Sequence, residues 1–409
     1  MDELPPDWSL LRRVTFRFGV VFAIAQIVPF PLDVLPKLEW LTSRYGDAWE
    51  WVLRGFADVI GAVIPPPQPT GSGDTTAAFV GLLMQVVLGA LGAAVWSAID
   101  ERRGRRAYPR LARGAHIVLR YWLAFAMLGY GIVKLCGVQF VPPRLATLDH
   151  QVGQMSPMGL LWTFMGFSRP YTLFAGVGEC LGGALLLWRR TATLGAVVLV
   201  AILTNVVMLN FCYDVPVKLY SSMLLLAAIV VVAPDLRRIL AALLGRAVPA
   251  RSVAWPLSRR GLWIRAIVKL VLVTLVIAVQ VHDDLEAGDQ RAVRSPLHGV
   301  YDVESYTIDG VELRDAQRWR RVIFEGGGAT IRAESDESTW YRAEIDDAAR
   351  TVALTLRGGS RETYAVSRPA ADRLVLDVAH VHVVLRLRTG EFPLMTRGFH
   401  WIHELPVNR

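Results

Sequence analysis

Long apolar stretches separated by short polar loops fill most of the chain up to about residue 281, and short alternating stretches follow. A helix needs about 20 apolar residues to cross roughly 30 Å of hydrocarbon. We therefore expect a polytopic α-helical membrane bundle of about seven transmembrane helices. The stretches, of which the sixth is short, are Val14–Phe30, Thr76–Ile99, Ala115–Gly137, Tyr171–Trp188, Thr193–Phe211, Leu219–Val232 and Leu262–Val281.

The pattern changes after Val281, where an acidic linker leads into runs with a period of two. Glycine-containing turns such as Asp309-Gly310 separate these runs, and this combination predicts antiparallel hairpins. About eight such strands fit a small antiparallel β barrel, lipocalin-like, or a sandwich. The expected strands are Val300–Ile308, Arg320–Glu325, Ala329–Glu334, Thr339–Ile345, Thr351–Arg357, Glu362–Ser367, Arg373–Val378 and Val381–Arg388.

These patterns predict four regions. Residues 1–111 form an N-terminal membrane hairpin with an outer interfacial segment, and residues 112–245 form a four-helix membrane core. Residues 246–295 hold the seventh helix and a linker, and residues 296–409 form the β domain. Within the first region, Trp40, Trp49 and Trp51 are interleaved with charged residues, which is typical of an amphipathic helix lying in the membrane interface.

Arginine clusters orient the predicted spans. They precede the first span, follow the second and the fourth, and lie between the sixth and the seventh, so seven spans place all of them on one side. Cytoplasmic loops carry such an excess of basic residues. We therefore expect a cytoplasmic (inner) membrane protein with a cytoplasmic N-terminus and an extracytoplasmic β domain. The net charge of +8 is largely this arginine, which indicates contact with anionic membrane lipid and not nucleic-acid binding.

Ionisable and amide side chains interrupt the apolar stretches of the predicted core. Charged groups at membrane depth are expensive, so they usually face a bundle interior or a wet cavity. Glu179 lies near the centre of its span, where its carboxyl should be protonated or paired. Two interpretations stay open: a hydrogen-bonded link between helices, and a proton-handling or headgroup-binding site. The candidate partners of Glu179 are Tyr130, Lys134, Asn205 and Arg169.

Further polar residues gather at the predicted outer ends of the spans. Lys134 could extend to the interface, and Lys218 could pair with Asp214 across a short loop. Asn210 lies at the end of the fifth span. This arrangement would suit an anionic or quinone-like headgroup that enters from the outer leaflet, or it could be a stabilising polar network with no ligand.

The cysteines and histidines give weaker signals. Cys136 and Cys212 both lie at predicted outer ends and could form a disulfide, but buried free thiols acting as small hydrophobes are favoured. His400 and His403 are spaced as in some zinc motifs, beside Glu404, without a third ligand. No metal site is predicted.

The stretch Arg120–Asp235 resembles the DoxX-like integral membrane protein family. The resemblance rests on a Tyr-Gly-x-x-Lys helix end at Tyr130–Lys134, a Glu-x-x-Gly-Gly helix at Glu179–Gly183 followed by Arg189, and a further helix carrying Asn205. More remotely, the stretch is similar to the HTTM bundle of vitamin K-dependent carboxylases, which also carry a β-rich outer domain.

This resemblance implies a four-helix core and a link to quinones. One DoxX branch is associated with thiosulfate:quinone oxidoreduction, and the carboxylases use a quinone cofactor. The chain lacks a haem, flavin or iron–sulfur motif of its own. Electrons would therefore need a partner protein subunit or a direct reaction between substrate and quinone, and enzymatic activity stays open.

Together the residues and the resemblance predict a protein that binds a quinone or a lipid headgroup in the outer half of its bundle. Lys134 and Lys218 would contact the headgroup, and Glu179 would relay protons, so Glu179 and Lys134 are the catalytic candidates. The alternative is a non-enzymatic membrane assembly factor or receptor that acts through its outer β domain on a partner protein.

Overall fold

The computed structural model describes residues 7–32, 37–68, 70–248, part of 260–278, 295–356, 358–390, 392–401 and 404. The chain forms two compact units. The first, which we call the helical unit, comprises Met1–Gln139 and Pro170–Asp284. The second, the β unit, comprises Phe140–Arg169 and Leu285–Arg409. The segment 140–169, which we expected within the membrane core, therefore belongs with the β domain.

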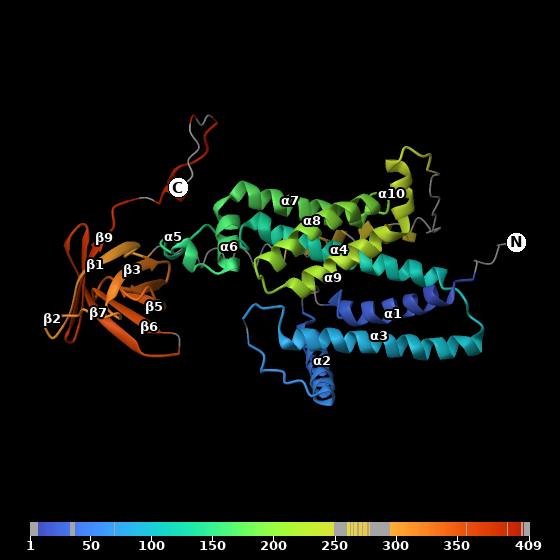
Figure 1. Ribbon diagram of the computed structural model, residues 1–409, viewed down its shortest axis with the longest axis horizontal. Helices are drawn as coiled ribbons and strands as arrows, with labels where there is room; N and C mark the ends of the chain where they lie inside the picture. Colours follow the sequence, from blue (N-terminus) through green and yellow to red (C-terminus); the bar gives the residue numbers. More distant parts are fainter. Residues whose placement is uncertain are drawn as a thin grey trace. The chain divides into compact units, whose positions relative to one another are not determined.

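The helical unit is built from helices, most of which cover nearly the same residues as the predicted spans (Figure 1). They are α1 (Leu10–Ile27), α2 (Glu39–Ile60), α3 (Thr76–Arg103), α4 (Pro109–Cys136), α7 (Arg169–Leu187), α8 (Ala192–Cys212), α9 (Lys218–Val232) and α10 (Leu236–Leu243), with the 3-10 turn η3 (Ala233–Asp235) between the last two.

Five of these segments are long and apolar enough to cross a membrane, which confirms a helical membrane bundle. They are Thr76–Arg103, Pro109–Cys136, Arg169–Leu187, Ala192–Cys212 and Lys218–Leu243. The predicted first span is helical as α1, but this helix carries three arginines and is not one of the five. Half of the predicted seventh span, Leu262–Val281, lies outside the described residues.

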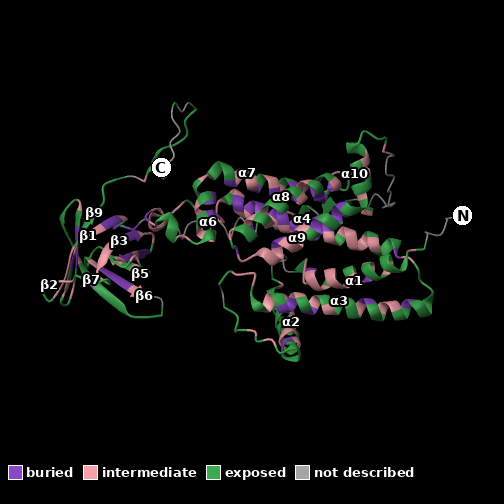
Figure 2. Cartoon of the chain, in the orientation of Figure 1, coloured by how far each residue is buried: buried purple, intermediate pink, exposed green. Residues whose placement is uncertain are grey.

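Helices α4, α7, α8 and α9 share one hydrophobic core. Leu123, Leu186, Leu199 and Ala228, one from each helix, are fully buried within it. Large apolar side chains such as Phe174 are exposed on these helices. Figure 2 shows buried and exposed positions alternating along the helices of the bundle. Outward apolar residues suit surrounding hydrocarbon, because lipid tails are as apolar as the side chains themselves.

The predicted amphipathic segment is the helix α2. Trp40 and Trp51 are exposed on it, and Arg54 forms an ion pair with Glu50 one turn away at 2.6 Å. Aromatic and charged groups on one exposed helix fit a position in the polar interface of a membrane.

The β unit contains an antiparallel barrel that follows the predicted strands closely. The strands are β1 (Gly299–Ile308), β2 (Val311–Glu312), β3 (Trp319–Glu325), β4 (Gly328–Ala333), β5 (Ser338–Asp346), β6 (Thr351–Leu356), β7 (Arg361–Ala370), β8 (Arg373–Val378) and β9 (Val381–Leu387), and the short helix α12 (Pro393–Thr396) follows. From β3 to β9 each strand pairs with the next, and β1 pairs with β2, β3 and β9. The β1–β9 pairing closes the sheet, so the domain is an eight-stranded barrel and not a sandwich.

The barrel core follows the alternation that the sequence predicts. Phe324, Leu376 and Val383 are fully buried on three different strands. Between β1 and β2, Asp309 and Gly310 both take positive φ values of 51° and 79°. Two successive positive φ values define the tight hairpin turn that favours glycine.

The segment 140–169 packs on the outside of the barrel wall. It contains α5 (Leu145–Leu148), the 3-10 turn η2 (Val152–Gln154) and α6 (Pro157–Phe167). Asp149 lies between α5 and η2, and the guanidinium groups of Arg321 and Arg332 bind its carboxylate. The side chains of Asp149 and Arg332 are each only 2% exposed. This buried ionic contact fastens the segment to β3 and β4.

The structure corrects the expectation for the cysteines. Cys136 and Cys212 are exposed on the helical unit, so the prediction that these thiols are buried is wrong. No disulfide joins the two residues, both of which the structure describes.

Candidate functional site

A buried ion pair joins two membrane-capable helices in the helical unit. The Nζ of Lys134, on α4, donates a hydrogen bond to Oε2 of Glu179, on α7, at 2.8 Å. Only 8% of the lysine side chain and 4% of the glutamate side chain are exposed. Among the four partners that the sequence left open for Glu179, the structure selects Lys134, and the lysine does not extend to the interface.

Glycines allow α4 and α7 to approach closely at this pair. A Cβ on Gly176 would lie 2.9 Å from the carbonyl oxygen of Gly131, and one on Gly183 would lie 2.9 Å from that of Ala124. A Cβ on Gly131 would clash with Cys180. Small residues commonly permit such close backbone packing between membrane helices. Gly176 and Gly183 stand three residues before and four residues after Glu179, so they place its carboxylate against α4.

The role of Gly131 and Gly176 in the close packing of α4 against α7 was not predicted from the sequence. The neighbouring glycines Gly178 and Gly182 face a different helix, because a Cβ on either would meet Ile202 or Leu199 of α8. The glycines of α7 therefore allow close packing against two helices, α4 and α8. Their spacing in the sequence alone does not show which glycine faces which helix.

Aromatic rings lie beside the ion pair and extend towards α9. The ring centre of Tyr130 is 5.7 Å from the Nζ of Lys134, within the range of a cation–π contact. The same ring is 6.0 Å from that of Tyr220, which in turn is 6.5 Å from the ring of Trp122. A cation and planar aromatic surfaces are thus adjacent.

A second polar cluster lies at the beginning of α9. Lys218 forms an ion pair with Asp214 at 2.7 Å, as the sequence indicated, and contacts Asp74 at 3.7 Å. Asp74 also accepts hydrogen bonds from the backbone N–H groups of Lys218 and Leu219 at 2.9 and 3.0 Å. These are the free donors of a helix N-terminus. Asp74 therefore caps α9, while Thr75 caps α3 by accepting from Ala78.

The remaining predicted site residues are more scattered. Asn210 is buried and donates to the hydroxyl of Ser221 at 3.0 Å. Asn205 is exposed on α8, so the structure places it on the bundle surface. Arg169 is exposed at the first residue of α7 and belongs to the β unit. The structure therefore brings together Lys134, Glu179 and Tyr130, and separately Asp214 and Lys218.

The sequence analysis missed another buried ion pair in the helical unit. Arg17 of α1 contacts Asp100 of α3 at 3.3 Å, and their side chains are 3% and 4% exposed. Arg17 also donates to the hydroxyls of Tyr108 and Ser97 at 2.7 and 2.6 Å. Because hydroxyls and a carboxylate together satisfy the guanidinium, this cluster joins α1 to α3 structurally. The presence of Arg17 inside a predicted span was the signal that could have found it.

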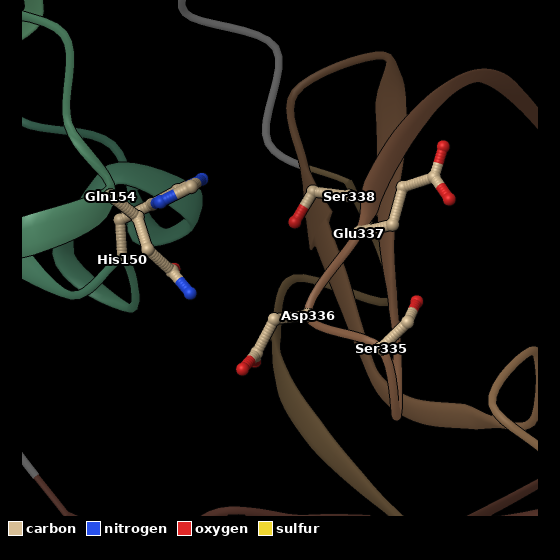
Figure 3. A pocket seen from close by; sticks show the side chains of 6 residues that line it. All are labelled: His150, Gln154, Ser335, Asp336, Glu337 and Ser338. Atoms are coloured by element: carbon tan, nitrogen blue, oxygen red, sulfur yellow. The ribbon is translucent and has the colours of Figure 1, made fainter.

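The β unit carries an open, polar hollow. Figure 3 shows His150 and Gln154 on one side of it and the turn Ser335–Ser338, between β4 and β5, on the other. Within this turn, Asp336 is already bound by Arg320. Among the residues that the structure describes, no group of three or more His, Cys, Asp or Glu side chains could hold a metal ion; His403 lies outside them.

The fold and the buried pair define a helical membrane protein with an appended β barrel. The chain is 33% identical over 136 residues to the uncharacterized protein YwoB of Bacillus subtilis (strain 168), a match that covers 33% of this chain and 86% of that protein. The chain therefore belongs to the family of YwoB. No family model matches the chain, and no solved structure matches it.

Proposed function

We propose that this chain is a DoxX-like multi-pass protein of the cytoplasmic membrane that binds a quinone or a lipid headgroup at the Lys134–Glu179 pair. The observation that carries the proposal is the burial of this pair between α4 and α7. Replacing a buried ion pair by well-packed apolar residues is often neutral or stabilising. Stability is therefore a weak reason for a charged pair inside a membrane bundle, and binding is a stronger one.

The residues around the pair supply the chemistry for a polar headgroup. The Lys134 ammonium has three N–H donors, which suit a quinone carbonyl or a phosphate oxygen. The rings of Tyr130 and Tyr220 offer flat surfaces beside it. Lys218, whose side chain is partly exposed at the start of α9, is positioned to contact a headgroup before it reaches the pair.

The two candidate headgroups would favour different protonation states of Glu179. A neutral quinone carbonyl could accept a hydrogen bond from Lys134 while Glu179 keeps its negative charge. A phosphate would place a second anion beside the same ammonium, and like charges in a buried site favour protonation of one of them. Binding of an anionic headgroup should therefore be accompanied by proton uptake at Glu179, whereas binding of a quinone should not.

The sequence and the β unit together support the proposed topology. Four arginine clusters fall on one side of a seven-span arrangement, which supports a cytoplasmic N-terminus. The segment 140–169 follows α4 in the sequence and is fastened to the barrel through Asp149. The lipocalin-like barrel accordingly shares a membrane side with the loop after α4, and we propose that this side is extracytoplasmic. Redox chemistry would need a partner subunit or the substrate as the electron source or acceptor.

Native mass spectrometry of the protein purified in mild detergent tests the proposal. The wild type should retain a quinone or a defined lipid, and Glu179→Gln and Lys134→Ala should lose it. Asp100→Asn is the matched control, because it perturbs a buried ion pair of similar exposure elsewhere in the same unit. If all four proteins carry the same bulk phospholipid, the pair has no ligand and the proposal is wrong.

A second candidate function is that of an assembly factor or receptor that acts through the β unit. The observation in its favour is the buried attachment of the segment 140–169 to the barrel wall, which makes this segment part of the β unit. In this case, deletion of Pro296–Arg409 should abolish the cellular phenotype, and Glu179→Gln and Lys134→Ala should leave it unchanged.

A further inference from the structure

The lumen of the barrel contains a carboxylate that its apolar core does not require. Side chains of a strand alternate between its two faces, and Tyr364 and Val366 of β7 lie in the barrel core. Glu362 stands two residues before Tyr364 and so lies on the same face of β7. It pairs with Leu354 of the neighbouring strand β6, which is buried. Glu362 therefore faces the lumen, and its exposure places it at the open end.

Aromatic side chains line the lumen beside this carboxylate. The ring of Trp319, on β3, lies 5.4 Å from that of Tyr306, on β1, and 6.0 Å from that of Tyr364, on β7. Strands β4, β5 and β6 separate β3 from β7 in the sheet, so the contact between Trp319 and Tyr364 crosses the lumen. Tyr341 of β5 packs against the same core.

One phenol group contacts Glu362 directly, and two more respond to its charge. The hydroxyl of Tyr364 donates to its Oε2 at 2.5 Å. Burial raises the pKa of Tyr364, and the hydrogen bond to Glu362 and its charge raise that pKa further. Burial followed by the same carboxylate also raises the pKa of Tyr306 and of Tyr341. The Glu362 carboxylate is therefore hydrogen-bonded to Tyr364, whose ring contacts Trp319, and its charge also acts on two tyrosines of other strands.

Nearby carboxylates differ from Glu362 in having basic partners. Glu344 pairs with Arg361 at 2.8 Å, and Glu312 pairs with Arg318 at 3.3 Å. Within the part of the chain that the structure describes, Glu362 forms no ion pair. An inward carboxylate bounded by aromatic faces is the arrangement that recognises organic cations, because both the charge and the ring quadrupoles attract them.

We propose that the open end of the barrel binds an organic ammonium cation, with its charge at Glu362 and its alkyl groups against Trp319, Tyr306 and Tyr341. A free amine and the ammonium headgroup of a lipid share this chemistry. This site is independent of the ion pair in the helical unit, so either proposal can fail without the other.

Equilibrium dialysis of the full-length protein tests this site, in dodecyl maltoside, a detergent without an ammonium group. The probes are radiolabelled choline, for a free cation, and dihexanoylphosphatidylcholine, for a lipid headgroup. Saturable binding of choline is expected, and Glu362→Gln should weaken it about tenfold or more. Glu362→Asp, which keeps the charge, should bind more tightly than Glu362→Gln. Preferential binding of the phospholipid would identify the lipid as the source of the cation.

The controls separate binding from folding and from the bundle site. Glu344→Gln removes a carboxylate from the outer face of β5 and should leave choline binding unchanged, as should Lys134→Ala. Near-ultraviolet circular dichroism checks that the barrel of Glu362→Gln is intact. The proposal is overturned if neither probe binds saturably at millimolar concentration, or if Glu362→Gln binds as tightly as the wild type.

Discussion

Removing one partner of the Lys134–Glu179 pair should destabilise the helical unit far more than removing both. In Glu179→Leu, the Lys134 ammonium stays buried without the carboxylate that it contacts at 2.8 Å. Breaking a buried pair in this way costs about 3–5 kcal/mol. The double variant K134M/E179L replaces both side chains by apolar ones, a change that ranges from neutral to stabilising by about 1–4 kcal/mol in comparable sites.

Both side chains are almost fully buried, so solvent does not screen the Lys134 ammonium that remains in Glu179→Leu. The cost of about 3–5 kcal/mol therefore applies to this single variant. One kcal/mol shifts the melting temperature of a unit of 150–250 residues by about 2–4 °C. Glu179→Leu should therefore melt about 6–20 °C below the wild type. The double variant should melt within a few degrees of the wild type or above it.

Thermal unfolding in dodecyl maltoside at neutral pH, followed by tryptophan fluorescence, measures both variants under the same conditions. If the double variant melted as low as Glu179→Leu, the ion pair itself would be necessary for the fold. That result would refute the reasoning that stability does not account for the pair.

Three further predictions concern packing, the attachment of the loop, and alkaline stability. Gly131→Ala places a Cβ against Cys180 and should cost about 1–3 kcal/mol in thermal unfolding. Asp149→Ala leaves Arg332 buried without its carboxylate; it should destabilise the β unit by about 3–5 kcal/mol and expose the segment 140–169 to limited proteolysis. Because the pKa of the Tyr364 hydroxyl is raised in the folded protein, the unfolded chain loses the phenol proton at a lower pH. The contribution of Tyr364 to the free energy of unfolding is therefore complete below about pH 10 and is lost as the pH rises further. Tyr364→Phe should accordingly flatten the loss of stability above about pH 10.

Each of these predictions has a control. Gly46→Ala lies in open space on α2 and should not destabilise the protein. Asp372→Asn removes an exposed carboxylate that pairs with Arg386, and it should leave proteolysis unchanged. For the alkaline transition, Phe399→Leu, which changes an exposed aromatic ring without an ionisable group, should retain the slope of the wild type. If a variant and its control changed the measured stability, proteolysis or alkaline slope equally, the structural reason given for that prediction would be wrong.

The sequence predicted the barrel in detail because each strand shows its own alternation and several turns carry glycine, such as Asp309-Gly310 and Gly358-Gly359. The eight predicted strands match the eight strands that close the barrel, and only the short β2 was not anticipated. Five of the seven predicted spans correspond to membrane-capable helices, because a continuous apolar run predicts such a helix regardless of its neighbours. Barrel closure between β1 and β9 depends on residues far apart in the sequence, so the alternative of a sandwich stayed open.

The candidate site was predictable only in part. Glu179 and Lys134 stand out because each interrupts an apolar run, but periodicity cannot show which of several polar residues meet. The helix rotation that joins them depends on Gly131, Gly176 and Gly183, whose role appears only when two backbones touch. Asp149 illustrates the same limit: an acidic residue in a loop gives no sign that arginines of a distant barrel will bury it.

The most direct test of the central claim measures the small molecules that co-purify with the double variant K134M/E179L. This variant removes the proposed binding groups while keeping the bundle folded, and R17M/D100L is the matched apolar replacement of the other buried pair. Mass spectrometry should find a quinone or a defined lipid at near-stoichiometric amounts in the wild type and in R17M/D100L, and its loss in K134M/E179L. Equal retention by all three proteins would contradict a binding site at Lys134 and Glu179.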